Sequence, residues 1–288
     1  MASIIEVKNL CYTYNADSKL KNNAISDVSF AIESGDIIGI IGHTGSGKST
    51  LVQHLNGLLK PTGGEVLLEG KNIWDEPKKI KDVRFKVGLV FQYPEYQLFE
   101  ETVFSDIAFG PKNMGIAGDE LINRVDEICE VVGIKKDYLK KSPFDISGGE
   151  KRRVAIAGVM AMRPKVLILD EPIAGLDPKG RRGIISMISR YRQAYGATVI
   201  IISHNMEDMA VLADKLLVMN KGRVEMYDTV YNVFSKKERL KEIGLGVPVV
   251  TEVLCEIAKT HPEIRTDIFT VEAAAKYLCA FAAGGKDA

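Results

Sequence analysis

The sequence predicts an α/β protein whose core is a parallel sheet covered by helices. Apolar runs that are typical of buried strands occur at residues 36–41, 87–91, 166–169 and 198–203. Helical segments separate these runs, and each run ends at polar side chains, as expected where a site lies at the carboxyl ends of parallel strands. Earlier runs, some of them alternating, predict an additional antiparallel β layer and cover residues 4–8, 28–32 and 66–69.

Two other regions of the chain predict helices rather than strands. Apolar side chains recur at helical spacing within residues 120–132, 149–162, 251–259 and 271–283. The first two helices belong to a helical subdomain at about residues 93–163, inserted into the sheet. The last two belong to a tail. We therefore expect one large domain of residues 1–240 and a small C-terminal module of residues 241–288, which we expect to mediate dimerisation.

Composition excludes several classes of protein. The 288 residues include 38 basic and 38 acidic side chains, so no net charge is available to collect nucleic acid or anionic lipid. The four cysteines are too widely spaced for a disulfide framework or a zinc site. No uncharged apolar run approaches the roughly 18 residues of a membrane span. If the protein works at a membrane, we expect another subunit to supply the membrane part.

A phosphate-binding loop is the strongest motif in the chain. Residues 42–49 read GHTGSGKS and fit GxxxxGK[ST] between a predicted strand and an amphipathic run at residues 50–59. Glycines in such a loop let successive backbone N–H groups face a phosphate, and the following helix adds its positive end. Lys48 would neutralise the β- and γ-phosphates of ATP, and Ser49 would ligate Mg²⁺. The predicted binding residues of this loop are Gly42, His43, Thr44, Gly45, Ser46, Gly47, Lys48, Ser49 and Thr50.

An acidic pair at a strand end supports the phosphate loop. The apolar run at residues 166–169 is followed by Asp170 and Glu171. Adjacent residues of a strand point to opposite sides, so we expect the two carboxylates to have different tasks. Asp170 suits the shell of Mg²⁺, and Glu171 suits the orientation of the water that attacks the γ-phosphate.

Three single residues fall where such a site needs them. Gln92 ends one predicted strand and can reach a metal ion or the attacking water, and His204 follows another strand and can contact the γ-phosphate. Tyr14 precedes the loop and can stack on adenine. Taken alone, each has a plainer explanation: a surface glutamine, a structural histidine and a tyrosine of the core.

A second glycine-containing helix start lies far from the first. Ser147, Gly148 and Gly149 open the predicted helix at residues 149–162 and offer another site for an anion. Since one ATP does not need two phosphate loops from the same subunit, this start would serve a nucleotide held by a partner chain. The alternative is an ordinary helix cap that contains glycine.

Over residues 1 to about 235 the order of these motifs resembles the ATP-binding cassette (ABC) ATPases. That resemblance implies a P-loop NTPase fold with a RecA-like parallel core, an antiparallel β subdomain and a helical subdomain, and it implies ATP hydrolysis with Mg²⁺. It makes Tyr14 the adenine-stacking aromatic and Gln92 a metal-sensing and coupling residue. It also makes Ser147 to Glu150 the signature that faces the partner's ATP, Asp177 part of a loop at the dimer interface, and His204 the histidine at the γ-phosphate.

Departures from the family pattern are few. Ile146 replaces the usual leucine, Ile173 a common threonine, and Glu150 the usual glutamine of the signature. Glu150 would either weaken contact with ATP or complement the helix dipole. Because Glu171 and His204 are both present, we expect the chain's own site to be catalytic.

Within the family, residues 90–99, 153–158 and 175–181 resemble the ATPases of energy-coupling factor transporters, and most closely the second of the paired subunits. These transporters import vitamins and transition-metal ions. The resemblance implies a second ATPase subunit, an integral membrane T subunit and a substrate-binding S subunit as partners, and a peripheral place on the cytoplasmic face of the cell membrane. The surface at residues 92–99 would grip a helix of the T subunit.

Two rival functions share the nucleotide motifs. A soluble cassette that acts on nucleic acid or ribosomes would usually carry coiled-coil insertions, tandem cassettes or basic tracts, which this sequence lacks, so we expect no nucleic acid partner. A regulatory cassette without catalysis would be expected to lose Glu171 or His204.

Overall fold

The computed structural model describes residues 3–15 and 22–282 of the chain. Predictions that fall on residues 1–2 or 283–288, including the last residue of the second tail helix, Ala283, lie outside the described residues. Within the described part, no helix has both the length and the apolar character needed to cross a bilayer.

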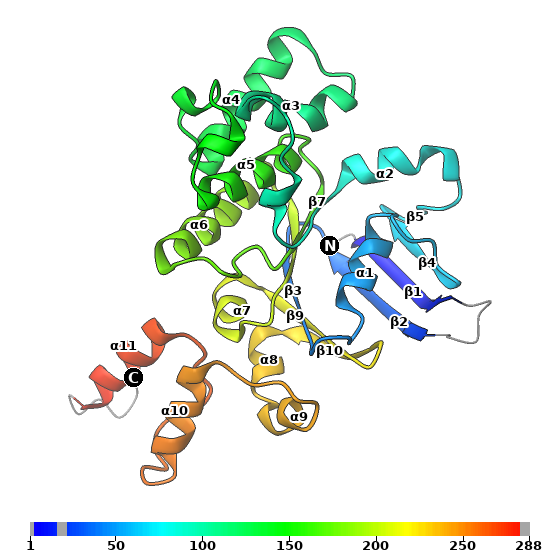
Figure 1. Cartoon of the computed structure of the whole chain (residues 1–288). Helices are drawn as coiled ribbons and strands as arrows, with labels where there is room; N and C mark the ends of the chain where they lie inside the picture. Colours follow the sequence, from blue (N-terminus) through cyan, green and yellow to red (C-terminus); the bar gives the residue numbers. More distant parts are fainter. Residues whose placement is uncertain (1–2, 16–21, 283–288) are drawn as a thin grey trace.

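A six-stranded sheet forms the centre of the molecule, in the order β10-β9-β3-β8-β7-β6 (Figure 1). Its strands are β3 (Ile37–Ile41), β6 (Val87–Val90), β7 (Val166–Asp170), β8 (Thr198–Ile202), β9 (Lys215–Asn220) and β10 (Arg223–Thr229). All neighbours pair in parallel except β10, which runs antiparallel to β9 at one edge. The parallel core is as predicted from the apolar runs, whereas β9 and β10 were not predicted from the sequence.

An antiparallel sheet lies beside the central one, in the order β2-β1-β4-β5. Its strands are β1 (Ser3–Tyr14), β2 (Asn22–Glu33), β4 (Gly63–Leu68) and β5 (Lys71–Asn72). Alternate side chains of β1 and β2, such as Val7 and Ile32, are buried in one cluster with Ile38 and Ile40 of β3 and with Leu51 of α1 (Lys48–Leu55). This cluster fixes one face of the central sheet against the antiparallel layer.

The predicted helix after the phosphate loop is too long. Helix α1 ends at Leu55, whereas the amphipathic run predicts a helix to residue 59. Gly57 adopts φ +70° and terminates the helix, and the buried side chain of Asn56 donates to the carbonyl of Val87. Leu58 consequently lies at the surface, 40% exposed, rather than on the apolar face of the helix.

The opposite face of the central sheet is covered by helices. These are α5 (Gly148–Met160), α6 (Pro178–Tyr195) and α7 (Met206–Leu212), with α3 (Val103–Asn113) and α4 (Gly118–Val132) stacked beyond α5 at the top of Figure 1. The first predicted helix of the subdomain matches α4 within two residues at its start, and the second, predicted at residues 149–162, matches α5 within one residue at its start and two at its end. Helix α3 was not predicted, because Gly110 and Pro111 interrupt its pattern.

Helix α2 (Ile80–Lys86) lies beside the antiparallel sheet. Four more helices follow the sheets: α8 (Val230–Phe234), α9 (Lys237–Glu242), α10 (Val249–Ala258) and α11 (Val271–Ala282). Helices α10 and α11 project from the body below α7 (Figure 1). They have their own small core, which is made by Leu254, Ile264, Ile268, Ala274 and Tyr277.

The division of the chain between residues 240 and 241 stays a prediction, and the packing shows which residues near it belong to the main core. Leu240, Leu245 and Val247 belong to the large core beneath the central sheet, so the cassette holds the chain as far as residue 247. Beyond that point the tail contacts the body through the ring of Phe269, which packs on Tyr231 and Phe234 of α8, and through polar contacts. The backbone N–H of Val249 donates to Glu207 Oε1 at 3.0 Å, for example.

Candidate functional site

The phosphate loop joins the carboxyl end of β3 to α1, as predicted. The ammonium of Lys48 donates to the carbonyls of Gly42 and His43, at 2.7 and 3.0 Å. The loop is also tied to the turn between β9 and β10, because the N–H of Gly222 donates to the carbonyl of Ser46 at 3.0 Å. The ammonium of Lys48 is therefore held at the start of α1, where the backbone N–H groups also attract anions.

Two glycines of this loop leave no room for a side chain. A Cβ at Gly42 would lie 2.4 Å from the carbonyl oxygen of Met219, and one at Gly47 would lie 2.7 Å from that of Ala24. Gly47 also adopts φ +102°, which disfavours any other residue. The loop can curl tightly only because both positions lack a Cβ, and this curl creates a cradle of the kind that binds phosphate.

Asp170 lies opposite the loop, at the end of β7. Its Oδ2 accepts a hydrogen bond from the Ser49 hydroxyl at 3.3 Å. Burial, and next the charge of Glu171, raises the pKa of Asp170, while burial lowers the pKa of Lys48 against the opposing effect of the two carboxylates. Carboxylate, hydroxyl and amide oxygens are the donors that Mg²⁺ prefers, so the residues present fit this ion.

Glu171 does not continue the strand. Its backbone adopts φ +50°, a conformation that costs a residue other than glycine about 1–2 kcal/mol. Its N–H donates to the carbonyl of Ile202 at 3.0 Å, and its Oε1 lies 2.7 Å from Nδ1 of His204. The alternation of side chains along a strand therefore does not apply at Glu171. The two carboxylates do have different partners, but both face the same pocket.

One pocket of about 590 Å³ unites most of the predicted residues. Its predicted lining residues are Tyr14, Thr44, Gly45, Gly47, Lys48, Ser49, Thr50, Gln92, Asp170, Glu171 and His204. The hydroxyl of Tyr14 lies 3.3 Å from Oγ1 of Thr50. Asn22, Asn23, Ala24 and Ile202 line the pocket too, and sequence reasoning missed them. The asparagines open β2 and belong to no motif, so no local signal marked them.

Three predicted residues of the phosphate loop, Gly42, His43 and Ser46, do not line the pocket. Ser46 is fully buried, and Gly42 packs against the carbonyl of Met219. The imidazole of His43 contacts the loop's own Thr44 carbonyl at 2.8 Å and, through Nε2, Oδ1 of Asn220 at 3.4 Å. Their positions indicate that they shape the loop.

The second glycine-containing start is separate from this pocket. Ser147 is the N-cap of α5, and Ser147 and Gly148 are exposed to solvent. Glu150 accepts both the N–H and the hydroxyl of Ser147 in its Oε2, at 2.9 and 2.7 Å. The hydroxyl of Ser147 is the main cause that lowers the pKa of Glu150. Glu150 therefore caps the helix, and both expectations for it, weaker contact with ATP and a complement to the helix dipole, stay predictions.

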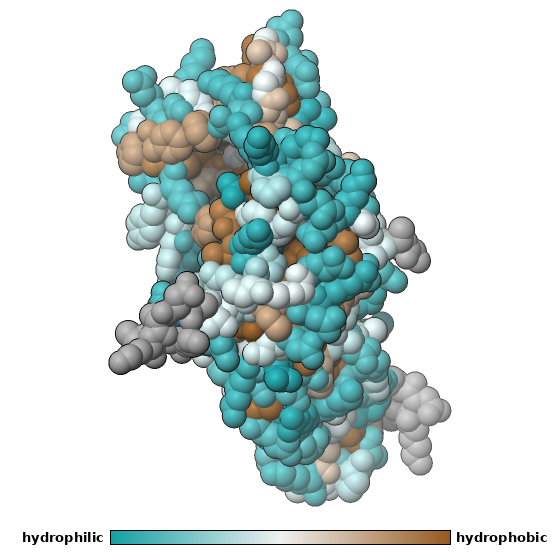
Figure 2. Space-filling model, turned by 90° about the vertical axis from the view of Figure 1, so that its right-hand side faces the viewer, coloured by the Kyte–Doolittle hydropathy of each residue, from teal (hydrophilic) through white to brown (hydrophobic). Residues whose placement is uncertain are grey.

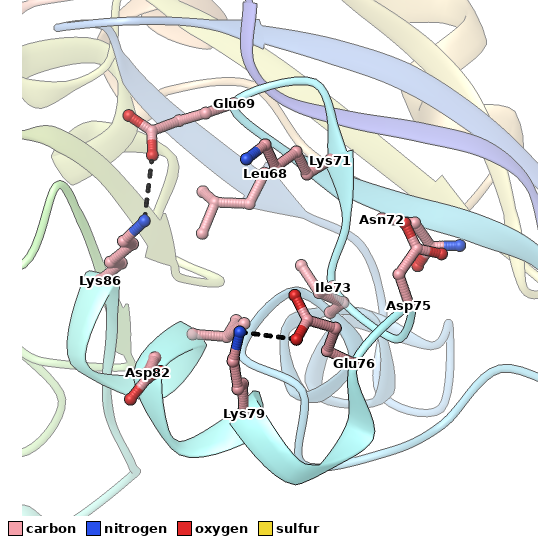
Figure 3. Close-up of a pocket in the computed structure, with 11 residues that line it drawn as sticks. Leu68, Glu69, Lys71, Asn72, Ile73, Asp75, Glu76, Lys79, Asp82 and Lys86 are labelled. Atoms are coloured by element: carbon pink, nitrogen blue, oxygen red, sulfur yellow. Dashed lines mark hydrogen bonds and ion pairs between the residues drawn. The ribbon is translucent and has the colours of Figure 1, made fainter.

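Another hollow, of about 300 Å³, lies between the β4–β5 hairpin and α2 (Figure 3). Its side chains carry charge of both signs, and two of its lysines pair with carboxylates: Lys79 with Glu76, and Lys86 with Glu69 at 3.4 Å. It includes no part of the phosphate loop. We therefore place the chemistry in the pocket between β3, β7 and α1.

Comparison with known proteins gives this geometry a family. The ABC transporter family profile matches residues 25–174. The chain is also 51% identical to the energy-coupling factor transporter ATP-binding protein EcfA2 of Caldanaerobacter subterraneus subsp. tengcongensis. The 283 aligned residues cover 98% of this chain and 99% of that protein. The chain belongs to the ABC transporter family. Like other cassettes of this family, it binds and hydrolyses ATP.

Solved ABC cassettes share the fold. The structure of cbiO1 from Clostridium perfringens, described as part of the ABC transporter complex cbiONQ, matches with a TM-score of 0.75 and 39% identity, over 84% of this chain and 95% of that one. The cassette MJ0796, a dimer in a post-hydrolysis state with ADP and Pi, matches with a TM-score of 0.70 and 26% identity, over 78% and 98%. These matches confirm the predicted ABC-type P-loop fold.

The cradle of the phosphate loop can be tested with alanine. We expect Gly47→Ala to weaken ATP binding at least about tenfold, because its Cβ would collide with Ala24 and its φ would be strained by about 1–2 kcal/mol. Binding of a fluorescent ATP analogue would measure the change. Gly35→Ala is the matched control, since Gly35 has φ +85° but open space around it. Equal losses in both variants would mean that strain alone, and not the cradle, is responsible.

Proposed function

We propose that this chain is the ATP-hydrolysing energy-coupling subunit of an ECF-type ABC importer for vitamins or transition-metal ions. The observation that carries the proposal is the presence in one cassette of a pocket that unites the phosphate loop with Asp170 and Glu171, and of an exposed apolar groove partly lined by residues 97–99. The EcfA2 relatives, near half identity over almost the whole chain, support the same assignment. The motor would lie on the cytoplasmic face of the membrane as a peripheral subunit.

Hydrolysis in the pocket would depend on positioning and on charge neutralisation. The backbone N–H groups of residues 42–49 and the ammonium of Lys48 hold the phosphates. Ser49, Gln92 and Asp170 would hold Mg²⁺, which supplies charge neutralisation at the β- and γ-phosphates. Tyr14 lies at the end of the pocket near Thr50, where its ring would stack on the adenine.

Glu171 and His204 would act at the γ-phosphate. Glu171 would orient the attacking water and accept a hydrogen bond from it, and its Oε1 contacts Nδ1 of His204 at 2.7 Å. The His204 side chain is 74% exposed while that of Glu171 is 12% exposed, so the imidazole is available to reach a phosphate at the pocket mouth.

A second copy of the cassette fold would complete the site. Ser147, Gly148 and Gly149 lie outside the chain's own pocket, with Ser147 and Gly148 exposed at the start of the 13-residue helix α5. A helix start of this kind attracts phosphate oxygens, so it would contact ATP held by a second ABC ATPase subunit. The MJ0796 structure is dimeric and bound to ADP and Pi, which supports a dimer for this cassette as well.

The groove would receive a helix of the membrane T subunit. It has a volume of about 540 Å³ and lies between α2, the segment of residues 97–99, α3 and α5. Phe99 is 61% exposed and packs edge to face on Phe109, which is also exposed. Figure 2 shows hydrophobic residues exposed in the upper half of the face on the α2 side, whereas the lower half is mostly hydrophilic. An apolar, aromatic groove suits the apolar face of a helix.

The tail would strengthen the dimer, and a separate S subunit would select the cargo. Val249 and Val253 of α10 and Val271 of α11 are exposed apolar residues beside the tail's own small core. Such residues favour contact with a second protein surface. The motor itself would not contact the vitamin or the metal ion that is transported.

The catalytic carboxylate is tested by Glu171→Gln. We expect ATP binding to persist and hydrolysis to fall by about 10²-fold or more, because the amide does not accept a proton from the attacking water. ATP would then hold the dimer closed, as measured by sedimentation with and without nucleotide. The control is Glu130→Gln, an exposed carboxylate on α4. Hydrolysis at the parental rate would remove Glu171 from its role.

The groove is tested by Phe99→Asp. A charge in the apolar groove should reduce recovery of the T subunit from detergent extracts of the membrane by about tenfold or more, since loss of a central aromatic contact typically costs an interface 2 kcal/mol or more. Ile122→Asp is the matched control, because Ile122 is 49% exposed but lies outside the groove. Equal recovery of the T subunit with both variants would exclude the groove as its docking site.

The tail is tested by deleting the residues from Val249 onward. This deletion keeps Leu245 and Val247 in the main core, which a deletion from Gly244 would remove. We expect the dimer dissociation constant to rise about tenfold, which corresponds to about 1.4 kcal/mol, while ATP binding is retained. Sedimentation of the full-length and shortened chains would compare them. Identical association would contradict a dimerisation role for α10 and α11.

A further inference from the structure

Arg152 is a charged side chain that the nucleotide site described above does not use. It lies on α5, five residues after Ser147, and is only 4% exposed. A buried guanidinium is unfavourable unless ion pairs and hydrogen bonds replace the water it has lost. Its partners therefore define where the charge is needed.

The guanidinium connects α5 to two other segments. It forms a bidentate ion pair with Glu95, from Nε to Oε2 at 2.9 Å and from Nη2 to Oε1 at 2.7 Å. In addition, Nη1 donates to the carbonyl of Ala174 at 2.6 Å and to that of Pro172 at 3.4 Å. Arginine suits this arrangement because its donors form a planar, rigid fork, whereas lysine offers one point of charge.

Glu95 is the link from Arg152 to the groove. It lies in the 3-10 turn Pro94–Gln97, directly before Gln97, Leu98 and Phe99, which line the groove. Burial raises the pKa of Glu95, but the hydrogen bond and charge of Arg152, together with a backbone N–H, outweigh it and leave the pKa below its ordinary value. The carboxylate is thus held charged against Arg152, and a wall of the groove is fixed to α5.

Ala174 is the link from Arg152 to the catalytic carboxylate. The N–H of Ala174 donates to the carbonyl of Glu171 at 3.2 Å, while its own carbonyl accepts from Arg152. Glu171 is held in a left-handed conformation, φ +50°, so its direction depends on the contacts that close the turn after it. Tyr93, at φ +55°, adopts the same conformation at the start of the segment of residues 93–99, which leads into the groove. Arg152 therefore joins two strained turns.

We propose that Arg152 is a positioning residue through which the segment at residues 93–99 sets the backbone, and hence the aim, of Glu171. The identity of the groove's occupant rests on the proposed function, whereas the effect on Glu171 does not. Neither Arg152 nor Glu95 lines the nucleotide pocket. Both should consequently act on the rate of hydrolysis more than on ATP binding.

The experiment measures Mg²⁺-dependent ATP hydrolysis by the purified full-length chain. We expect Arg152→Lys, which keeps the charge but not the fork, to lower kcat at least about tenfold while the half-saturating ATP concentration changes less than about threefold. We expect Glu95→Gln to lower kcat as well. Parental kcat in Arg152→Lys would overturn the proposal.

A double variant separates positioning from stability. Arg152→Gln alone leaves the half-buried carboxylate of Glu95 without its partner and is expected to lower the unfolding temperature. In the double variant Glu95→Gln/Arg152→Gln both charges are absent, so the unfolding temperature should recover while kcat stays low. The double variant should be no slower than Arg152→Gln, because both residues act along one route. Recovery of kcat together with stability would reduce Arg152 to a structural residue and overturn the proposal.

Arg192→Gln is the control. Arg192 also donates to a backbone carbonyl, that of Gly35 at 2.8 Å, and pairs with Asp214 at 2.9 Å. Gly35 and Asp214 precede β3 and β9, so this contact lies at the ends of the strands opposite to the nucleotide pocket. The kcat of Arg192→Gln should equal the parental value, and a matching loss in this variant would overturn the proposal by making the effect nonspecific. A parental chain that recovers no membrane subunit would contradict the proposed function alone, since the kcat comparison does not need that subunit.

Discussion

The parallel register of three strands is the constraint on which the site depends. Ile40 of β3 pairs with Ile202 of β8, and Ile202 pairs in turn with Asp170 of β7. This ladder places the end of each strand at one edge of the sheet, so that Lys48, Asp170 and His204 meet although they are distant in the chain. A shift of one residue in any of these pairings would separate the phosphate loop from its carboxylates, because successive side chains of a strand face opposite ways.

Charge balance is the second requirement of this edge. Burial disfavours the charged form of Lys48 and of Asp170 alike, and it therefore shifts their pKa values in opposite directions. Each charge makes the other more favourable, and Glu171 adds a second negative charge nearby. The site thus contains more negative than positive side-chain charge beside the loop, which suits a cation delivered together with a polyphosphate.

The sequence was sufficient for the parts of the molecule that local patterns encode. A glycine-rich loop between an apolar strand and a helix has one well-known use, so the phosphate loop, the parallel core and most of the pocket could be predicted. The end of α1 was predicted too late, because the apolar spacing continues to Leu59 past Gly57, and the contact of Asn56 with Val87 of β6 cannot be seen in a local pattern. Nor could Arg152 be predicted, since a Lys-Arg-Arg run normally indicates a solvated helix face. Its burial results from Glu95, 57 positions earlier.

The capping of α5 has a consequence for how tightly two cassettes can hold a nucleotide. The hydroxyl of Ser147 has a single proton, and Glu150 already receives it at 2.7 Å. If a phosphate oxygen accepted the hydrogen bond from this hydroxyl, it would displace the carboxylate of Glu150, so one charged acceptor would replace another. The gain from the contact is therefore the difference between two hydrogen bonds of similar strength, rather than the full value of one. In the proposed dimer the serine would add geometric selectivity to the interface, and the stabilisation of the subunit contact would come largely from the loop N–H groups and from other surfaces.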